Sequence, residues 1–207
     1  MTPETATVFV VDNDPSVRKA LARSLLTAGL KVKTFASARE FLDQDPPGSP
    51  GCLVLDVRMP GLSGLELQAE LNARDIRIPI IFITGHGDIP LSVKAMKGGA
   101  TDFLTKPFKL GNLIRAIREA LQQDEFLQAS RAKNAEVQRC IETLTPRERE
   151  VLDLVVKGRL NKQIGEELGA AESTIKVHRG RVMNKMQVQS VADLVRDMAG
   201  LAPKHRE

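Results

Sequence analysis

The chain has 207 residues and a formal net charge of +4, and 42% of its residues are hydrophobic. These values are ordinary for a globular protein with a real core, and the length fits one large domain or two small ones. Only Cys52 and Cys140 carry thiols, which excludes a disulfide framework and a cysteine-rich zinc site. We find neither an apolar run of ~20 residues nor a signal-peptide pattern, so we expect a cytoplasmic protein with no membrane partner.

The first 121 residues alternate between short apolar runs and helical patterns. Asp14 precedes Pro15 as a helix cap followed by proline at the first helical position, and Ser37 is placed to cap the second helix. The expected strands span residues 7–11, 31–35, 52–57, 78–83 and 102–105. The expected helices span residues 15–28, 38–42, 63–73, 91–97 and 110–121. This alternation predicts an α/β fold with a five-stranded, doubly wound parallel sheet of the flavodoxin-like type.

The remainder of the chain has a different composition. Residues 122–143 are polar, prone to form helix and free of glycine and proline, so we expect a helical linker, either separate from the preceding helix or continuous with it. Four short helical patterns follow, over residues 146–157, 162–168, 172–186 and 191–201. They predict a second, small all-α domain. The expected division is a first domain over residues 1–124, a linker over 125–142 and a second domain over 143–207.

Polar residues follow four of the predicted strands. They are Asp12 with Asn13 and Asp14, then Asp56, Thr84 and Lys106. In a doubly wound sheet the carboxyl ends of the strands border one crevice, so we expect these side chains to meet there. Clustered carboxylates repel one another unless a cation joins them, and such oxygen ligands suit Mg²⁺. An aspartate can become an aspartyl-phosphate, while a hydroxyl and an ammonium group hold the phosphoryl oxygens.

Taken singly, each of these residues has a simpler explanation. A lone aspartate after a strand is commonly a helix cap, Thr84 could cap a turn, and Lys106 could be a solvated surface lysine. Four strand ends that each supply the appropriate chemistry favour a functional site over four independent structural roles.

The pattern VVDND…LDVRMPGLSG…ITGHGD…DFLTKPF resembles the receiver domain of two-component response regulators. This resemblance implies that Asp56 is the phosphoacceptor, that Thr84 binds a phosphoryl oxygen and that Lys106 forms an ion pair with Asp56. It also implies that Phe103 turns inward on activation and that the peptide bond before Pro107 is cis. The implied Mg²⁺ ligands are Asp12, Asn13, Asp56 and the backbone carbonyl of Arg58.

Asn13 departs from the family pattern, which has an aspartate that ligates the metal directly. An amide oxygen can still coordinate Mg²⁺ but carries no charge. We therefore expect weaker Mg²⁺ affinity unless Asp14 compensates.

The last third of the chain contains a predicted helix-turn-helix. Leu168–Glu172 forms a short turn with one glycine, and the following helix has four Lys or Arg and no acid between Ser173 and Lys185. Ile175, Val182 and Met186 share its core face. The opposite face is polar and basic, which suits the major groove of DNA, although a merely solvated charged face is the simpler alternative.

The segment LTPREREVLDLVVKGRLNKQIGEELGAAESTIKVHRGRVMNKM resembles the DNA-binding domain of the LuxR, NarL and FixJ group. The resemblance places Lys176 and Val177 at base-contacting positions, and Arg181 lies on the same exposed face. It makes Thr174, His178, Arg179 and Lys185 candidates for phosphate or mixed contacts. Asn161 opens the preceding helix, whose N-terminal N–H groups favour a phosphate.

Together the two resemblances imply a response regulator of this group, closest to the FixJ-type regulators of nitrogen fixation. They imply a FixL-like histidine kinase, Mg²⁺, a phosphorylated homodimer, promoter DNA and RNA polymerase as partners, and activation of nitrogen-fixation or low-oxygen genes. An aspartate-nucleophile phosphatase would need an acid two residues after Asp56, where Arg58 stands, so we do not expect a turnover enzyme. A DNA-binding protein that ignores phosphorylation and has a degenerate receiver is the remaining alternative.

Overall fold

A computed structural model of the chain describes residues 6–44, 50–85 and 89–201, and it divides into two compact units after Gln128. The first unit is an α/β domain, as the alternating sequence patterns predict. Its strands are β1 (Thr7–Val11), β2 (Lys31–Phe35), β3 (Gly51–Asp56), β4 (Ile80–Thr84) and β5 (Asp102–Thr105). All neighbouring strands are parallel, in the order β2-β1-β3-β4-β5. The predicted doubly wound parallel sheet is therefore confirmed.

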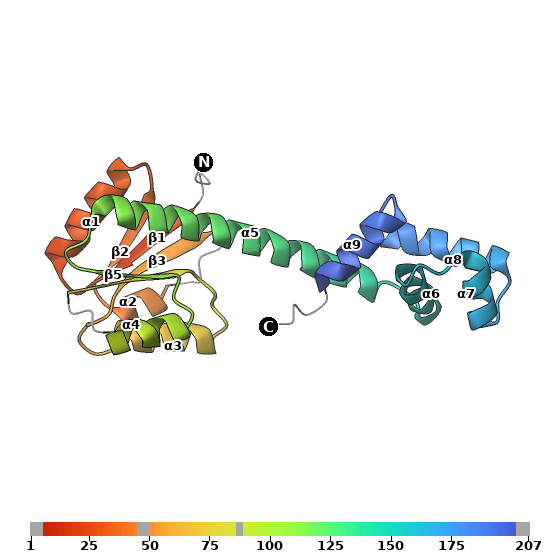
Figure 1. Cartoon of the computed structure of the whole chain (residues 1–207), viewed down its shortest axis with the longest axis horizontal. Helices are drawn as coiled ribbons and strands as arrows, with labels where there is room; N and C mark the ends of the chain where they lie inside the picture. Colours follow the sequence, from red (N-terminus) through yellow and green to blue (C-terminus); the bar gives the residue numbers. More distant parts are fainter. Residues whose placement is uncertain (1–5, 45–49, 86–88, 202–207) are drawn as a thin grey trace. The chain divides into compact units, whose positions relative to one another are not determined.

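Helices cover both faces of this sheet. They are α1 (Pro15–Thr27), α2 (Ala38–Leu42), α3 (Gly64–Ala73), α4 (Ile89–Lys97) and α5 (Leu110–Glu142). Figure 1 shows α1 and α5 on one face and α2, α3 and α4 on the other. The bounds differ from the predicted ones by at most two residues, except at the end of α5.

The central strands have no polar face because both of their faces are buried. Side chains alternate between the two faces, so Leu53 and Leu55 of β3 join the core under α2, α3 and α4. Cys52 and Val54 join the opposite core under α1 and α5. The continuous apolar run that predicted this strand reflects burial on both sides.

Helix starts follow the predicted capping residues. The carboxylate of Asp14 accepts hydrogen bonds from the backbone N–H groups of Ser16 and Val17, and Pro15 occupies the first position of α1. The hydroxyl of Ser37 accepts from Glu40 N at the start of α2. Residues 45–49 lie outside the described residues, and β3 begins at Gly51, one residue before the predicted strand.

Helix α5 continues far beyond residue 121 and includes the predicted linker over residues 125–142. It has 33 residues and contributes to both units, so the linker is continuous with the preceding helix. Asp124 is buried within it, and its Oδ2 accepts from Gly51 N at 3.0 Å and from the side-chain amide of Gln128 at 2.8 Å. Sequence reasoning missed Asp124 because nothing in a polar helical segment distinguishes an anchoring acid from a solvated one.

The second unit is all-α, as predicted. Besides the end of α5 it contains α6 (Pro146–Val156), α7 (Asn161–Leu168), α8 (Glu172–Lys185) and α9 (Val191–Leu201). Its core includes Ile175, Val182 and Met186 of α8, the three residues expected on the core face of that helix.

The structure bears on the state of the cysteines and on membrane-spanning helices. Cys52 and Cys140 are free thiols. Within residues 6–44, 50–85 and 89–201, we find no helix with the length and apolar character needed to cross a membrane.

Gly64 tests how tightly the start of α3 packs against the end of β3. A Cβ at this position would collide with the carbonyl oxygen of Asp56 and lie 3.1 Å from the ring of Phe82. We expect Gly64→Ala to lower the free energy of unfolding by about 1–3 kcal/mol, as overpacking does. Gly111→Ala is the control, since nothing lies within 4 Å of the added carbon. Urea unfolding followed by circular dichroism measures both, and equal stability of the two variants would contradict the prediction.

Candidate functional site

Two carboxylates lie together at the carboxyl ends of the central strands. Asp12 follows β1 directly and Asp56 ends β3, and both residues are buried. Parallel pairing sets Val11 beside Leu55, so the register of the two strands brings these acids to the same edge of the sheet. The structure therefore brings together two of the residues predicted to meet at the strand ends.

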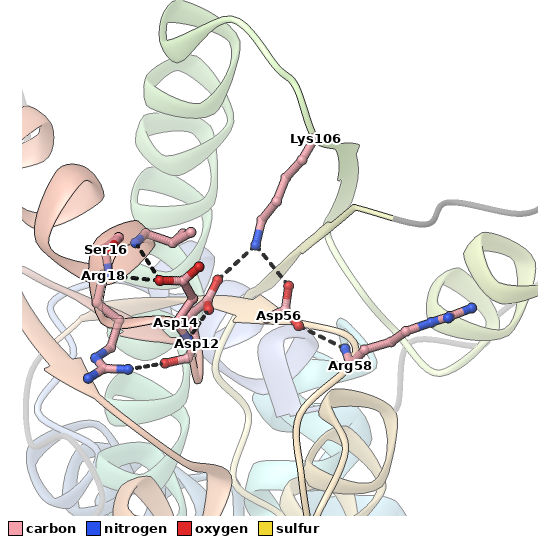
Figure 2. Close-up of polar contacts among 8 residues, drawn as sticks. Asp12, Asp14, Ser16, Arg18, Asp56, Arg58 and Lys106 are labelled. Atoms are coloured by element: carbon pink, nitrogen blue, oxygen red, sulfur yellow. Dashed lines mark hydrogen bonds and ion pairs between the residues drawn. The ribbon is translucent and has the colours of Figure 1, made fainter.

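Lys106 joins the two acids. Its Nζ donates to Oδ2 of Asp12 at 2.8 Å and to Oδ1 of Asp56 at 2.9 Å (Figure 2). The lysine follows β5, and its backbone N–H donates to the carbonyl of Thr84 at 2.7 Å, which ties the turn to β4. The bond from Lys106 to Pro107 is cis, as the resemblance implies. One ammonium group thus offsets the repulsion between two buried carboxylates.

The surroundings of Asp56 disfavour an uncompensated negative charge on its carboxyl group. Burial raises the pKa of its carboxyl above the ordinary value, and this effect outweighs the hydrogen bond and charge of Lys106, which lower it. Burial alone would lower the pKa of Lys106, but the hydrogen bonds and charges of Asp12 and Asp56 raise it overall. The lysine therefore stays protonated at neutral pH and supplies the positive charge of the site.

Asn13 and Asp14, the two residues that follow Asp12, have different surroundings. Asn13 is exposed, so its amide is open to solvent beside the carboxylate pair. Asp14 caps α1 with its carboxylate, while its own backbone N–H donates to Oδ1 of Asp12 at 2.8 Å. The cap occupies Oδ1 of Asp14.

Arg18 belongs to the same corner and was missed by sequence reasoning. Its Nη1 donates to the backbone carbonyl of Asp12 at 2.7 Å and so holds the turn that carries Asp12 and Asn13 (Figure 2). An arginine on the second turn of an amphipathic helix has no distinguishing signal in one sequence, because most such residues are solvated.

The other predicted site residues surround this centre. The backbone N–H of Arg58 donates to Oδ2 of Asp56 at 2.9 Å, while its guanidinium points away from the carboxylates (Figure 2). Thr84 is buried at the end of β4. Phe103 of β5 is half-buried, with its ring centroid 6.3 Å from that of Phe82.

The donor atoms at this edge fit a small hard cation. The carboxylates of Asp12 and Asp56 supply oxygen atoms, and Asn13 follows Asp12 in the chain. Mg²⁺ is commonly bound by one or two carboxylates with waters and phosphate oxygens. Across the parts of the chain that the structure describes, three or more His, Cys, Asp or Glu side chains nowhere form a metal-binding group. The two carboxylates of Asp12 and Asp56 are oxygen ligands of the kind that suits Mg²⁺.

The second candidate surface lies on α8 in the C-terminal unit. Ser173, Gly180 and Asn184 are exposed on the face opposite the core. Val177 on that face keeps 53% of its surface exposed, which is unusual for a β-branched apolar side chain. The exposed basic and polar residues predicted to contact DNA from this helix are Thr174, Lys176 and Arg181. The exposed face of α8 is thus basic, with one apolar side chain within it.

Three other predicted contact residues are partly buried. Nη1 of Arg179 donates to Oδ1 of Asn161, the first residue of α7, at 2.9 Å. His178 is half-buried, and its Nδ1 is buried with no hydrogen-bond partner among the described residues. The bond from Arg179 to Asn161 links the two helices of the predicted helix-turn-helix.

Lys185 has a partner inside the protein. Its Nζ contacts Oε2 of Glu148 at 2.7 Å and the backbone carbonyl of Thr143 at 3.0 Å. Glu148 is buried, and its Oε2 also accepts from Thr145 N at 2.9 Å in the capping box of α6. The hydrogen bonds from Lys185 and Thr145 lower the pKa of Glu148 to about 2.

The turn between α7 and α8 is closely packed. Gly169 ends α7 in the left-handed region at a φ of 63°. A Cβ on Gly165 would lie 2.6 Å from the carbonyl oxygen of Ala170, so glycine is required for this approach. Nη2 of Arg147, on α6, donates to the carbonyl of Leu168 at 2.5 Å.

Comparisons with known proteins agree with both surfaces. The family described as the response regulator receiver domain matches residues 8–118. The family described as bacterial regulatory proteins of the luxR family matches residues 142–198.

Several relatives match along nearly their whole length. Nodulation protein W of Bradyrhizobium diazoefficiens is 50% identical, over 98% of this chain and 90% of its own. The transcriptional regulatory protein FixJ of Azorhizobium caulinodans is 46% identical, over 97% of this chain and 96% of its own. The structure of the response regulator StyR has a TM-score of 0.84 and 49% identity, covering 94% of this chain and 98% of the other.

The depressed pKa of Glu148 predicts a pH dependence for the C-terminal unit. The folded pKa of about 2 lies below the ordinary 4.5, so this carboxylate stabilises the fold fully above about pH 4.5 and loses its contribution as the pH falls toward 2. We expect Glu148→Gln to lower the free energy of unfolding at neutral pH by an amount on the order of 1 kcal/mol. The difference from the unmodified chain should vanish near pH 2.

Denaturant unfolding at several pH values, with hydrogen exchange to assign the transition to α8, measures this difference. A deficit that stays constant from neutral to strongly acidic pH would show that the charge of Glu148 is not its cause.

Proposed function

Since this chain belongs to the two-component response regulators that join a receiver domain to a LuxR-type DNA-binding domain, we propose that phosphorylation of Asp56 controls its binding to promoter DNA. Members of this family are transcription regulators and not turnover enzymes. The observation that carries the proposal is the bridge from Lys106 to Asp12 and Asp56, which brings a buried carboxylate and a cation to one open strand end.

The proposed reaction is phosphoryl transfer from a phosphohistidine of a histidine kinase. An oxygen of Asp56 attacks the phosphorus, the new O–P bond replaces the N–P bond, and the histidine nitrogen leaves with its electron pair. Lys106 neutralises charge on the phosphoryl group, and the hydroxyl of Thr84 donates to one of its oxygens. The backbone N–H of Arg58, already 2.9 Å from Oδ2, orients the attacking carboxylate.

Mg²⁺ bound at this site would supply positive charge to the transferring phosphoryl group. Asp12, Asp56, Asn13 and the carbonyl of Arg58 are the residues that would hold it. Asp14 is a weak substitute for a missing acidic ligand, because one of its carboxylate oxygens already caps α1.

The phosphoryl group adds roughly two negative charges at Asp56. Thr84 and Lys106 then move toward it, and Phe103, which is only half-buried, repacks into the space near Phe82. We propose that the altered surface formed by α4, β5 and the start of α5 pairs with a second copy. The homodimer presents two DNA-binding domains to a palindromic site.

The exposed face of α8 is the proposed recognition surface, and α8 is called the recognition helix from here on. Lys176 and Arg181 can donate to guanine edges, and the exposed Val177 can contact a thymine methyl group. Thr174 is exposed and suits a phosphate contact. Asn161, His178 and Arg179 lie at the edge of this face, with Arg179 already bonded to Asn161.

The regulated genes are a finer proposal. Similarity to FixJ of Azorhizobium caulinodans and to nodulation protein W supports a FixL-like kinase and activation of nitrogen-fixation or low-oxygen genes through RNA polymerase. A comparable identity to the differently named StyR shows that likeness at this level spans several regulators. Because its partners are a kinase, promoter DNA and RNA polymerase, we place its work in the cytoplasm.

The first prediction from this proposed function concerns Asp56. Treatment of the native chain with acetyl phosphate and Mg²⁺ should add one phosphoryl group, form a dimer and tighten binding to promoter DNA at least about tenfold, as a coupling of ~1.4 kcal/mol would. Asp56→Asn should remove all three responses because the attacking oxygen is lost. Mass spectrometry, light scattering and gel-shift titration measure them.

Asp43→Asn is the matched control, since this exposed acid follows α2, which packs on β2 at the opposite edge of the sheet from β5. Labelling that persists in Asp56→Asn would place the acceptor elsewhere. Tight DNA binding by the unlabelled native chain, unchanged by phosphorylation, would favour the phosphorylation-independent alternative.

The second prediction concerns Asn13. Asn13→Asp adds a carboxylate next to Asp12 in the chain, and we expect it to tighten Mg²⁺ binding by about 2 kcal/mol, or roughly thirtyfold. This is the Coulomb energy of a divalent cation and a solvated carboxylate at ~4 Å. Gln123→Glu makes the same charge change at an exposed position of α5 and should leave the affinity unaltered. Isothermal titration calorimetry with MgCl₂ compares them, and equal affinities for native and Asn13→Asp chains would refute the expectation.

A further inference from the structure

We infer that Arg147 and Glu148, two neighbours in the first turn of α6, position both ends of the recognition helix for sequence readout. Neither residue lies on the exposed face of α8, and Lys185, which sequence reasoning assigned to DNA, is the partner of Glu148. This inference rests on the proposed DNA-binding function and concerns how specificity arises within it.

The first contact acts just before the recognition helix begins. Arg147 donates to the carbonyl of Leu168, the last residue of α7, and so ties α6 to the turn that leads into α8. Helix C-termini leave such carbonyls without an intrahelical partner, and a guanidinium supplies a strong charge-assisted donor. The same turn is constrained by the close approach of Gly165 to Ala170.

The second contact acts at the last residue of the recognition helix. Lys185 reaches Glu148 and the carbonyl of Thr143, so the end of α8 is fixed to α6 and to the segment between α5 and α6. Glu148 keeps only 3% of its surface exposed, and its low pKa keeps it ionised. A buried carboxylate that lost this lysine would be left poorly compensated, so the contact is strongly favoured.

Both contacts start from a stretch of backbone that is itself well fixed. Thr145 and Glu148 form a reciprocal capping box at the start of α6. Val151, Leu152 and Val155 then anchor the helix in the core. Adjacent residues of one rigid turn therefore hold the recognition helix at its entry and at its end.

Holding both ends matters for specificity more than for general affinity. Non-specific DNA binding follows from positive charge near phosphates, whereas base readout needs side chains at defined distances from base edges. A recognition helix that tilts or slides keeps its charges but loses its base contacts. Loss of either contact should therefore reduce the ratio of specific to non-specific affinity.

Charge gives this inference a sharp test. Glu148→Gln removes a negative charge, so simple electrostatics predicts tighter DNA binding, whereas loss of positioning predicts weaker specific binding. Glutamine still accepts the capping hydrogen bond of Thr145, which limits the effect on folding. Asp153→Asn makes the same charge change at an exposed position of the same helix and is the matched control.

The probes are two duplexes of equal length and composition. One is the sequence that the phosphorylated full-length native chain selects from a random pool, and the other has the same bases in shuffled order. Titrations at several salt concentrations give both dissociation constants and the salt dependence for native chain, Glu148→Gln, Asp153→Asn, Arg147→Lys, Lys185→Gln and Lys185→Arg.

We expect Glu148→Gln, Arg147→Lys and Lys185→Gln each to lower the specificity ratio about tenfold or more, the cost of losing one good base contact. Affinity of Glu148→Gln for the shuffled duplex should hold or rise. Asp153→Asn and Lys185→Arg should keep the native ratio, because Lys185→Arg retains the partner charge.

A native ratio in Glu148→Gln would overturn the inference. So would an equal loss on both duplexes in Lys185→Gln with a shallower salt dependence, because that is the behaviour of a phosphate contact. If Glu148→Gln loses its helical circular dichroism, the ratios of Arg147→Lys and Lys185→Gln decide. A native chain that selects no sequence would overturn the proposed function as well, while intact native selectivity with unchanged variants would overturn this inference alone.

Discussion

The structure depends on two acids that the parallel sheet forces together. The register of β1 and β3 sets Asp12 and Asp56 at one edge, where burial penalises charge and the carboxylates repel. Lys106 offsets that repulsion, because its ammonium group lies within 2.9 Å of an oxygen of each acid. The two acids need a positive charge close by, and Lys106 is the group that supplies it. A metal cation or a phosphoryl group bound here could therefore change the contacts among Lys106, Asp12 and Asp56.

This arrangement connects Asp56 to other elements of the fold. Lys106 lies in the turn that follows β5, and its backbone is bonded to Thr84 at the end of β4. In the proposed phosphorylation of Asp56, a phosphoryl group that bonded to Lys106 would compete with Asp12 for the same ammonium group. Helix α5 starts at Leu110 and runs on to Glu142, so the element that follows the lysine also contributes to the C-terminal unit.

Sequence alone predicted the sheet and the family of both units, and the structure and comparisons confirm these. Of the residues predicted to meet at the strand ends, the structure brings Asp12, Asp56 and Lys106 together. These features were accessible because strands buried on both faces read as continuous apolar runs, and because strand ends meet by topology. Asp124, Arg18 and Arg147 were not accessible, since each acts on a backbone group distant in sequence or across a turn. The individual roles in phosphorylation and DNA contact stay predictions.

Lys185 shows why a basic run cannot be read as a binding surface residue by residue. Helical periodicity separates the core face from the outer face, yet Lys185 lies between them, where a long side chain can reach either solvent or a buried acid. Lys185 turns toward Glu148, which lies 37 positions away in the sequence. A buried carboxylate without a cationic partner is costly, and this cost exceeds what the lysine gains from solvation. The positive charge of this helix therefore has two uses: Lys176 and Arg181 face outward, and Lys185 fixes the helix that presents them.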